Sequence, residues 1–359
     1  MSAVPSHQRV IEGCSLCPRL CHHVCPAAHG AGSEEGTAWG LMTIVAALGE
    51  GSLPRDAETA AALYRCTGCG RCTAFCKHGN EVASVLYAAR AEAVSAGEPP
   101  EAVAALEFEL EGMRSDEEQA RADQLRAKHG ADGNLAFLAG ARWLESDDAA
   151  ARLGQLMQLL EGLAGQRVGL LFEGSDGCCG GAATRAGFAT LGQEQRTALL
   201  ETAAGRDRLV VDCADAAAAI GARAVHLTRF LAEQSDAIAA RCAGLPPATI
   251  RLHGGCRERR VVNLASDELL LLAALGVTAE PVLDLRGQPE CCGGEAIYAA
   301  VHPAEAERAG RSLVQRTLGC AAAATSSLGC AAHLRKSGAE KTHAVIHWVL
   351  ARCAGQEAP

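Results

Sequence analysis

Four cysteines at residues 66–76, in the run CTGCGRCTAFC, constrain this chain more than any other feature. Two, two and three residues separate them, which is the spacing of bacterial [4Fe–4S] ferredoxins. Three thiolates on so short a loop reach three irons of one cube, and the fourth is directed to a second cluster. Gly68 and Gly70 are small enough to let backbone amides turn toward the sulfurs. The run predicts four cluster ligands: Cys66, Cys69, Cys72 and Cys76.

A second run, CSLCPRLCHHVC at residues 14–25, is followed by a proline. Its cysteines are Cys14, Cys17, Cys21 and Cys25. One extra residue separates the second cysteine from the third, so we expect the loop to bulge there. By analogy with two-cluster ferredoxins, the last cysteine of each run serves the cluster of the other run. The expected ligand sets of the two [4Fe–4S] clusters are Cys14, Cys17, Cys21 and Cys76 for one, and Cys66, Cys69, Cys72 and Cys25 for the other.

Other uses of these cysteines fit the pattern less well. Cysteine accounts for 18 of 359 residues, and disulfide scaffolds that rich in cysteine are short and exported. Structural zinc needs only four ligands and leaves the ferredoxin spacing unexplained. Covalent haem at the C-x3-C-H run of residues 17–22 would require export, and the first residues show no export signal. We therefore expect iron–sulfur clusters in a reducing cytoplasm.

The charge and the hydropathy of the chain argue against nucleic acid and against direct membrane insertion. The formal charge is −9 and no basic run is present, which argues against a nucleic-acid partner. No stretch approaches the roughly 18 apolar residues of a membrane-spanning helix. We expect a cytoplasmic protein, associated with a membrane only through a partner.

The rest of the chain divides by its pattern. Residues 1–97 predict an all-helical domain, with helices in 37–51, 56–66 and 80–97, and residues 98–131 predict a helical linker. From residue 134, short apolar runs alternate with helical stretches, which predicts an α/β unit with mainly parallel strands. The predicted strands are Asn134–Ala139, Val168–Phe172, Leu209–Val211, Thr249–Leu252, Val282–Leu285 and Ala321–Thr325.

A Cys-Cys-Gly-Gly motif occurs twice, at residues 178–181 and 291–294. This internal repeat predicts two related α/β Cys-Cys-Gly lobes, residues 132–245 and 246–359. The expected fold is thus multidomain, with an all-α two-[4Fe–4S] ferredoxin domain followed by the two lobes. The glycine pair permits close approach of the following helix and its amides to the thiolates.

This combination resembles the heterodisulfide reductase iron–sulfur proteins. Relatives include the iron–sulfur subunit of anaerobic glycerol-3-phosphate dehydrogenase and the lactate-utilisation iron–sulfur proteins. The family module contains a cysteine, Cys-Cys-Gly and C-x-x-C, which can hold an unusual [4Fe–4S] assembly or zinc. In the second lobe the resemblance implies a catalytic metal or third-cluster site at Cys256, Cys291, Cys292 and Cys330. Ser327 replaces one cysteine, so either its oxygen is a ligand or one iron stays open, and His253 matches a family histidine.

The first lobe has lost more of the module. Cys178, Cys179 and Cys213 remain, whereas residues 141–143 and Ala216 stand where the other cysteines should fall. We expect this lobe to be mainly structural, with at most a weak metal site.

Two functions remain open. The first is an oxidoreductase component that passes electrons through two clusters to or from a thiol/disulfide, a quinone or a partner at the second lobe. The second is a non-catalytic wire or docking adaptor, with structural or zinc-binding lobes. No G-x-G-x-x-G motif follows a predicted strand, so we expect the flavin on a partner dehydrogenase or reductase subunit.

Overall fold

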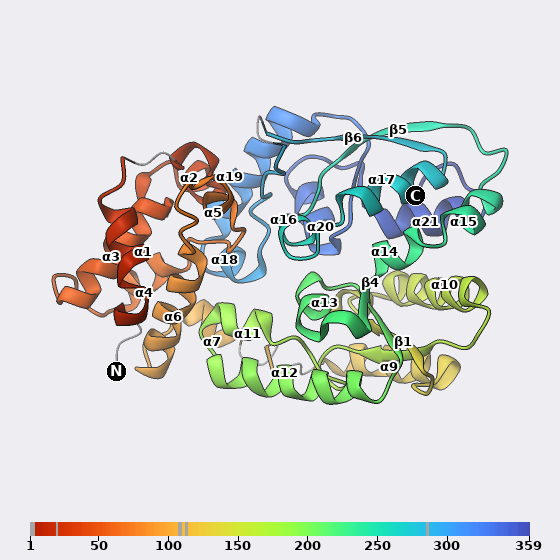
Figure 1. Cartoon of the computed structure of the whole chain (residues 1–359), viewed down its shortest axis with the longest axis horizontal. Coiled ribbons are helices and arrows are strands. Elements are labelled where there is room, and N and C mark those ends of the chain that lie inside the picture. The colour runs from red at the N-terminus through yellow and green to blue at the C-terminus, as the bar shows by residue number, and fades with distance from the viewer. Residues whose placement is uncertain (1–3, 19–20, 107–109, 112–113, 285–286) are drawn as a thin grey trace.

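The computed structural model describes residues 4–18, 21–106, 110–111, 114–284 and 287–359. Helices alone form the N-terminal part, and two small parallel sheets with surrounding helices form the remainder (Figure 1). Among the described residues, no helix combines the length and the apolar character that crossing a bilayer requires.

The N-terminal part is helical, as its sequence predicts. Its elements are α1 (Val4–Ser15), η1 (His22–Val24), α2 (Pro26–Ala31), η2 (Glu34–Gly36), α3 (Ala38–Glu50), α4 (Ala57–Leu63), α5 (Arg71–Phe75) and α6 (Val82–Ser95). Thr37 and Asp56 cap α3 and α4, because their side chains accept hydrogen bonds from the backbone amides of the first turn. Gly51 and Gly97 end α3 and α6 in the left-handed region, with φ of +73° and +77°.

A buried arginine ties this helical part to the remainder. Arg90 of α6 is 1% exposed and donates hydrogen bonds to the carbonyl oxygens of Leu63, Cys66 and Arg185. Its guanidinium also stacks 4.7 Å from the ring centre of Tyr64. The start of the second cysteine run is therefore held by a group that also fixes residue 185.

Two described helices within residues 98–131 pack on the two cores. The described elements are α7 (Glu101–Ala105) and α9 (Asp116–His129), which agree with the predicted helical character. Val103 of α7 is fully buried in the N-terminal core, and Leu125 of α9 is buried in the core around the sheets. The status of this segment as a separate linker stays a prediction.

The two sheets share one topology. The first contains β1 (Leu135–Ala139), β2 (Gly169–Phe172), β3 (Arg208–Val211) and β4 (Ala224–His226), in the order β2-β1-β3-β4. The second contains β5 (Ala248–Leu252), β6 (Val277–Pro281), β7 (Ala323–Thr325) and β8 (Thr342–Ala344), in the order β6-β5-β7-β8. All pairings are parallel. The sequence repeat therefore corresponds to a repeated strand order, while the limits of the two lobes stay a prediction.

Helices surround and separate the sheets. They are α10 (Asp147–Ala164), α11 (Gly181–Ala186), α12 (Ala189–Ala204), α13 (Ala214–Ile220), α14 (Leu227–Ala232), α15 (Ser235–Arg241), α16 (Cys256–Arg260), α17 (Ala265–Ala274), α18 (Ala296–Val301), α19 (Pro303–Leu313), α20 (Leu328–Lys336) and α21 (Val345–Cys353), with short turns η3 (Ala141–Trp143) and η4 (Gly221–Arg223) and a π-helix η5 (Val314–Leu318). A single hydrophobic core includes Phe137 of the first sheet, Leu252 of the second, and Leu271 of α17. Figure 1 shows α18 and α19 beside the N-terminal helices α2 and α5.

One predicted strand is wrong, and three strands, β4, β6 and β8, were not predicted. Residues 282–284 are not a strand, Leu285 lies outside the described residues, and the strand β6 precedes them. β6 is an edge strand with mostly exposed side chains, so it lacks an apolar signal. Val282 is buried because its amide continues the ladder to Leu252. β4 and β8 have three residues each, too few for a recognisable pattern.

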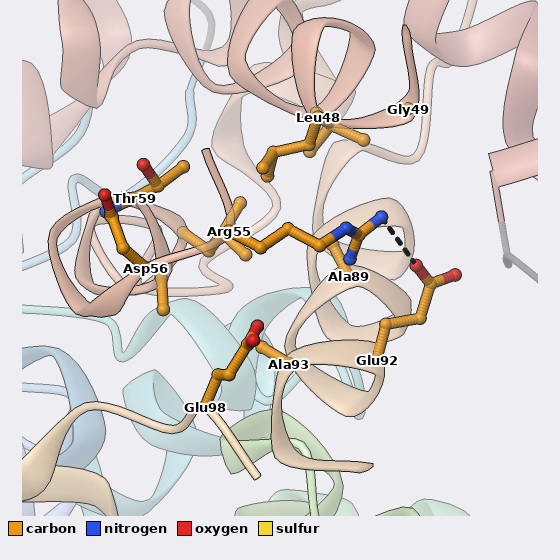
Figure 2. A pocket seen from close by; sticks show the side chains of 12 residues that line it. Leu48, Gly49, Arg55, Asp56, Thr59, Ala89, Glu92, Ala93 and Glu98 are labelled. Atoms are coloured by element: carbon orange, nitrogen blue, oxygen red, sulfur yellow. Dashed lines mark hydrogen bonds and ion pairs between the residues drawn. The ribbon is translucent and has the colours of Figure 1, made fainter. Parts of the chain in front are cut away.

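A small hollow between α3, α4 and α6 is shown in Figure 2. Its volume is about 30 Å³, and an ion pair between Arg55 and Glu92, 4.0 Å long, lies in its wall. Such a volume holds about one water molecule. No cysteine is among the described residues that line it, and we assign it no binding role.

The buried His226 at the end of β4 should make the stability of the fold depend on pH. Its Nδ1 accepts a hydrogen bond from the Thr228 amide, and burial lowers its pKa from 6.5 to about 4. Between these values the unfolded chain binds the proton and the folded chain does not, so stability falls as the pH falls. From pH 7 to pH 5 this group alone removes about 2 kcal/mol from the free energy of unfolding.

His226→Asn keeps an acceptor at the helix start but does not titrate. Urea unfolding of the full chain at both pH values should show a smaller loss in the variant by about that amount. An equal loss in the two proteins would contradict the assignment.

Candidate metal centres

The first group of cysteines contains the four that were predicted for one cluster. Cys14 lies in the last turn of α1, and Cys76 follows α5 directly. Together with Cys17 and Cys21 they line a cavity of about 250 Å³. The expected bulge falls at Arg19 and Leu20, which lie outside the described residues. Two distant runs thus meet at one cavity.

The second group contains Cys25, Cys66, Cys69 and Cys72, which line a second, smaller cavity. Cys25 comes from the first run and the other three from the second. Cys72 lies in the walls of both cavities, so the two groups are neighbours. Each cavity therefore combines cysteines from both runs, and the assignment of the cysteines to two clusters stays a prediction.

Five of the thiols in the two groups are difficult to ionise alone. Burial raises the pKa of Cys14, Cys66 and Cys72, of Cys21 to about 11 and of Cys25 to about 12. A thiol must lose its proton to become a metal ligand, and a bound cation provides the compensating charge. Two sets of four buried or half-buried thiols therefore fit the donor set of two [4Fe–4S] clusters.

Each of the two groups contains a cysteine sulfur that accepts a hydrogen bond from a nearby donor. The Asn80 Nδ2 donates to Cys14 Sγ over 3.2 Å, and the Gly68 amide donates to Cys66 Sγ over 3.3 Å. Gly68 has φ of +64°, and a Cβ atom there would overlap the hydroxyl of Tyr87. The predicted role of this glycine is confirmed, because the amide could not turn toward the sulfur with a larger residue.

Comparison with known families agrees with this geometry. Residues 10–80 match the family model of the 4Fe-4S dicluster domain, a stretch that contains both cysteine runs. The chain is an iron–sulfur protein. No curated protein and no solved structure matches the chain. The match supports iron–sulfur clusters over the zinc and haem alternatives for these two runs.

A third group of cysteines lies around the second Cys-Cys-Gly motif. Cys256 Sγ lies 4.0 Å from Cys291 Sγ, which makes one pair. Ligand atoms of His253, Cys292 and Cys330 lie within 4.8 Å of one another, which makes a trio. The four predicted cysteines are thus gathered at one place, but they belong to two subsets.

The glycines after the cysteine pair have the predicted function. The amides of Gly293 and Gly294 donate to Cys291 Sγ and Cys292 Sγ, each over 3.4 Å. Gly293 has φ of +81°, and a Cβ atom on Gly294 would overlap the ring of His333. Gly181 donates to Cys179 in the same way in the first motif.

The side chain of Ser327 caps a helix, and its hydroxyl oxygen is already engaged in a hydrogen bond. Its Oγ accepts a hydrogen bond from the Cys330 amide over 3.2 Å and caps α20. Loss of such a cap costs about 1 kcal/mol. The prediction that Ser327 supplies an oxygen ligand is not supported by any further contact of this oxygen among the described residues.

The second and third groups touch each other. A hydrogen bond with Cys291 lowers the pKa of Cys69 to about 5, and Cys291 Sγ lies 3.7 Å from Thr67 Oγ1. Arg260 joins the same two segments, because it donates to the carbonyl oxygens of Cys69 and Pro289 over 2.8 and 3.1 Å. The loop of the second run therefore lies directly against the second Cys-Cys-Gly motif.

Arg71 fixes this loop from its other side. It is 4% exposed, and it donates to the Val24 carbonyl oxygen over 3.1 Å and to Asp284 over 2.9 Å. The contacts join the two cysteine runs and the segment that precedes the second motif. Neither Arg71 nor Arg260 has a sequence signal that separates it from an ordinary surface arginine.

The first Cys-Cys-Gly motif presents fewer ligands. Cys179 Sγ and Cys213 Sγ lie 3.9 Å apart, with Asp215 beside them. The Asp215 carboxylate is already paired with Arg185, over 2.9 Å, and with Arg257. Burial raises the pKa of Glu173, a second carboxyl group that lies near Cys213 and Cys179. The expected structural role of the group formed by Cys178, Cys179 and Cys213 stays a prediction.

Trp143 stands where the first cysteine of this lobe should fall. Its indole nitrogen donates to Asp212 over 2.5 Å, and the side chain is buried. A large, hydrogen-bonded side chain here fills space that a cysteine would leave open.

Asn80 was not identified from the sequence, and it generates a prediction. Asn80→Ala removes the donor to Cys14, and loss of such a supporting hydrogen bond weakens metal binding roughly 10–100-fold. In the anaerobically purified protein, iron loss to a chelator should become faster, with half of the clusters affected. Asn134→Ala, in an exposed side chain before β1, is the control. Equal rates in both variants would show that this hydrogen bond does not support the cluster.

Proposed function

We propose that this chain is an electron-transfer component with two [4Fe–4S] clusters, held by the crossed ligand sets of the first two cysteine groups. The observation that carries the proposal is the gathering of four cysteines at each of two adjoining cavities within the dicluster match. Each cluster, when bound, supplies a one-electron carrier.

The proximity of Cys69 and Cys291 supports a route for electrons between the second and third groups. Cys69 belongs to the second group and Cys291 to the third, and Cys291 lowers the pKa of Cys69 to about 5. Thr67 and Arg260 hold the same two segments together. We infer that the third group, Cys256, Cys291, Cys292 and Cys330, is where electrons leave or enter.

The acceptor or donor at this end is a thiol/disulfide, a quinone or a protein partner, as in the heterodisulfide reductase relatives that the sequence resembles. One disulfide takes up two electrons and two protons and yields two thiols. Two one-electron carriers hold the required number of electrons. The other end would meet a flavin-containing dehydrogenase or reductase subunit in the cytoplasm.

The alternative is a wire or docking adaptor without catalysis. The pairing of Asp215 with two arginines favours this role for the first Cys-Cys-Gly motif, because it replaces a ligand set by ion pairs. The third group is the part that distinguishes the two functions.

Reoxidation of the reduced protein tests the catalytic form of the proposal. The full chain is purified anaerobically, reduced, freed of reductant and mixed with bis(2-hydroxyethyl) disulfide or with menadione. We expect one disulfide to be consumed, and two thiols formed, for every two electrons released. Cys291→Ala should slow this step at least about tenfold, because it removes the contact with Cys69.

Cys320→Ala is the matched control, because Cys320 is exposed. Reoxidation by menadione alone would assign a quinone instead of a disulfide. Equal rates in the wild type and both variants, with either acceptor, would favour the adaptor.

A further inference from the structure

His253 lies in the middle of the third group. It follows β5 directly, and its amide donates to the Ala324 carbonyl oxygen over 2.9 Å, so the backbone is fixed between β5 and β7. Ligands commonly gather at the carboxyl ends of parallel strands. A ring nitrogen of His253 and the sulfurs of Cys292 and Cys330 all lie within 4.8 Å of one another.

The imidazole of His253 is buried without a partner. The residue is 1% exposed, and neither ring nitrogen has a hydrogen-bond partner among the described residues. A buried polar group without a partner costs free energy, and such groups are rare in folded proteins. An ion bound to the imidazole would provide a partner for one of these two nitrogens.

The trio has the donors and the spacing of a mononuclear site. Two thiolates and an imidazole are the ligand types that zinc prefers. With Zn–S bonds of about 2.3 Å, tetrahedral geometry places two sulfurs about 3.8 Å apart. The observed separations require only a small closure around the ion.

The surroundings favour a cation. Two carboxyl groups, Glu258 and Glu268, are 8% and 4% exposed and interact electrostatically with His253. One oxygen of Glu268 has no hydrogen-bond partner among the described residues. Burial raises the pKa of both carboxyl groups, that of Glu268 to about 7, and a divalent ion bound nearby would favour their charged forms and be stabilised by them.

The geometry points to a mononuclear divalent-metal site, of the zinc class, formed by His253, Cys292 and Cys330 with an exogenous fourth ligand. In this site His253, and not Ser327, replaces the cysteine that the Cys-Cys-Gly module has lost. Ser327 is excluded because its oxygen caps α20. Cys256 and Cys291 then remain as a pair in contact with Cys69. The inference goes beyond the electron-transfer proposal, since the ion could be bound whether or not electrons pass.

Metal analysis of the full chain, purified anaerobically and incubated with Zn²⁺, tests this site. We expect one zinc per chain in addition to the iron and sulfide of the N-terminal clusters. X-ray absorption at the zinc edge should show two sulfurs at about 2.3 Å and at least one imidazole nitrogen at about 2.0 Å. His253→Ala should weaken zinc binding by roughly 100-fold or more, because even supporting residues of metal ligands contribute 10–100-fold.

Two controls separate this result from a general loss of structure. His226→Asn changes an equally buried histidine elsewhere, and Ser327→Ala changes the competing ligand. Both should retain the zinc. Full zinc in His253→Ala, loss of zinc in Ser327→Ala, a shell of sulfur alone, or four additional irons in place of zinc would each overturn the inference. Iron and sulfide in the N-terminal groups, measured in the same samples, report separately on the electron-transfer proposal.

Discussion

The structure depends on thiol groups that are buried where they cannot ionise by themselves. Burial raises the pKa of Cys25 to about 12 and of Cys21 to about 11, far above neutral pH. Metal binding must therefore release the protons and replace them with compensating charge, which couples cofactor binding to folding. The same physical condition holds for the buried Cys291 and Cys292 of the third group. The helices and sheets serve to bring these thiols together and to exclude water from them.

The loop at residues 66–76 joins all three groups. It supplies Cys76 to the first group, receives Cys25 from the other run, and places Cys69 against Cys291. Arg71 and Arg260 bind it to segments more than 180 residues away in sequence. The N-terminal helical domain and the second Cys-Cys-Gly motif are therefore packed together through this loop, although they lie far apart in the sequence.

Local features were predictable from the sequence, and features that depend on distant contacts were not. The helices α3, α4 and α6 follow from caps and periodicity, and the meeting of cysteines from both runs at each cavity follows from their spacing. The edge strand β6 was misplaced because its exposed residues show no apolar pattern. His253 was noted only as a match to a family motif, since its burial and its distance to Cys330 depend on how β5 and β7 pair. The repeat predicted two similar sheets, but not the core they share.

The crossed ligand sets are the central claim, and iron and acid-labile sulfide analysis of double variants tests them most directly. The anaerobically purified wild type should contain about eight irons and eight sulfides, as two [4Fe–4S] clusters require. Cys25→Ala combined with Cys66→Ala should remove only one cluster, leaving about four irons, because both residues serve the same cluster. Cys25→Ala combined with Cys14→Ala should remove both clusters. The opposite result, with one cluster left in the second double variant and none in the first, would contradict the account.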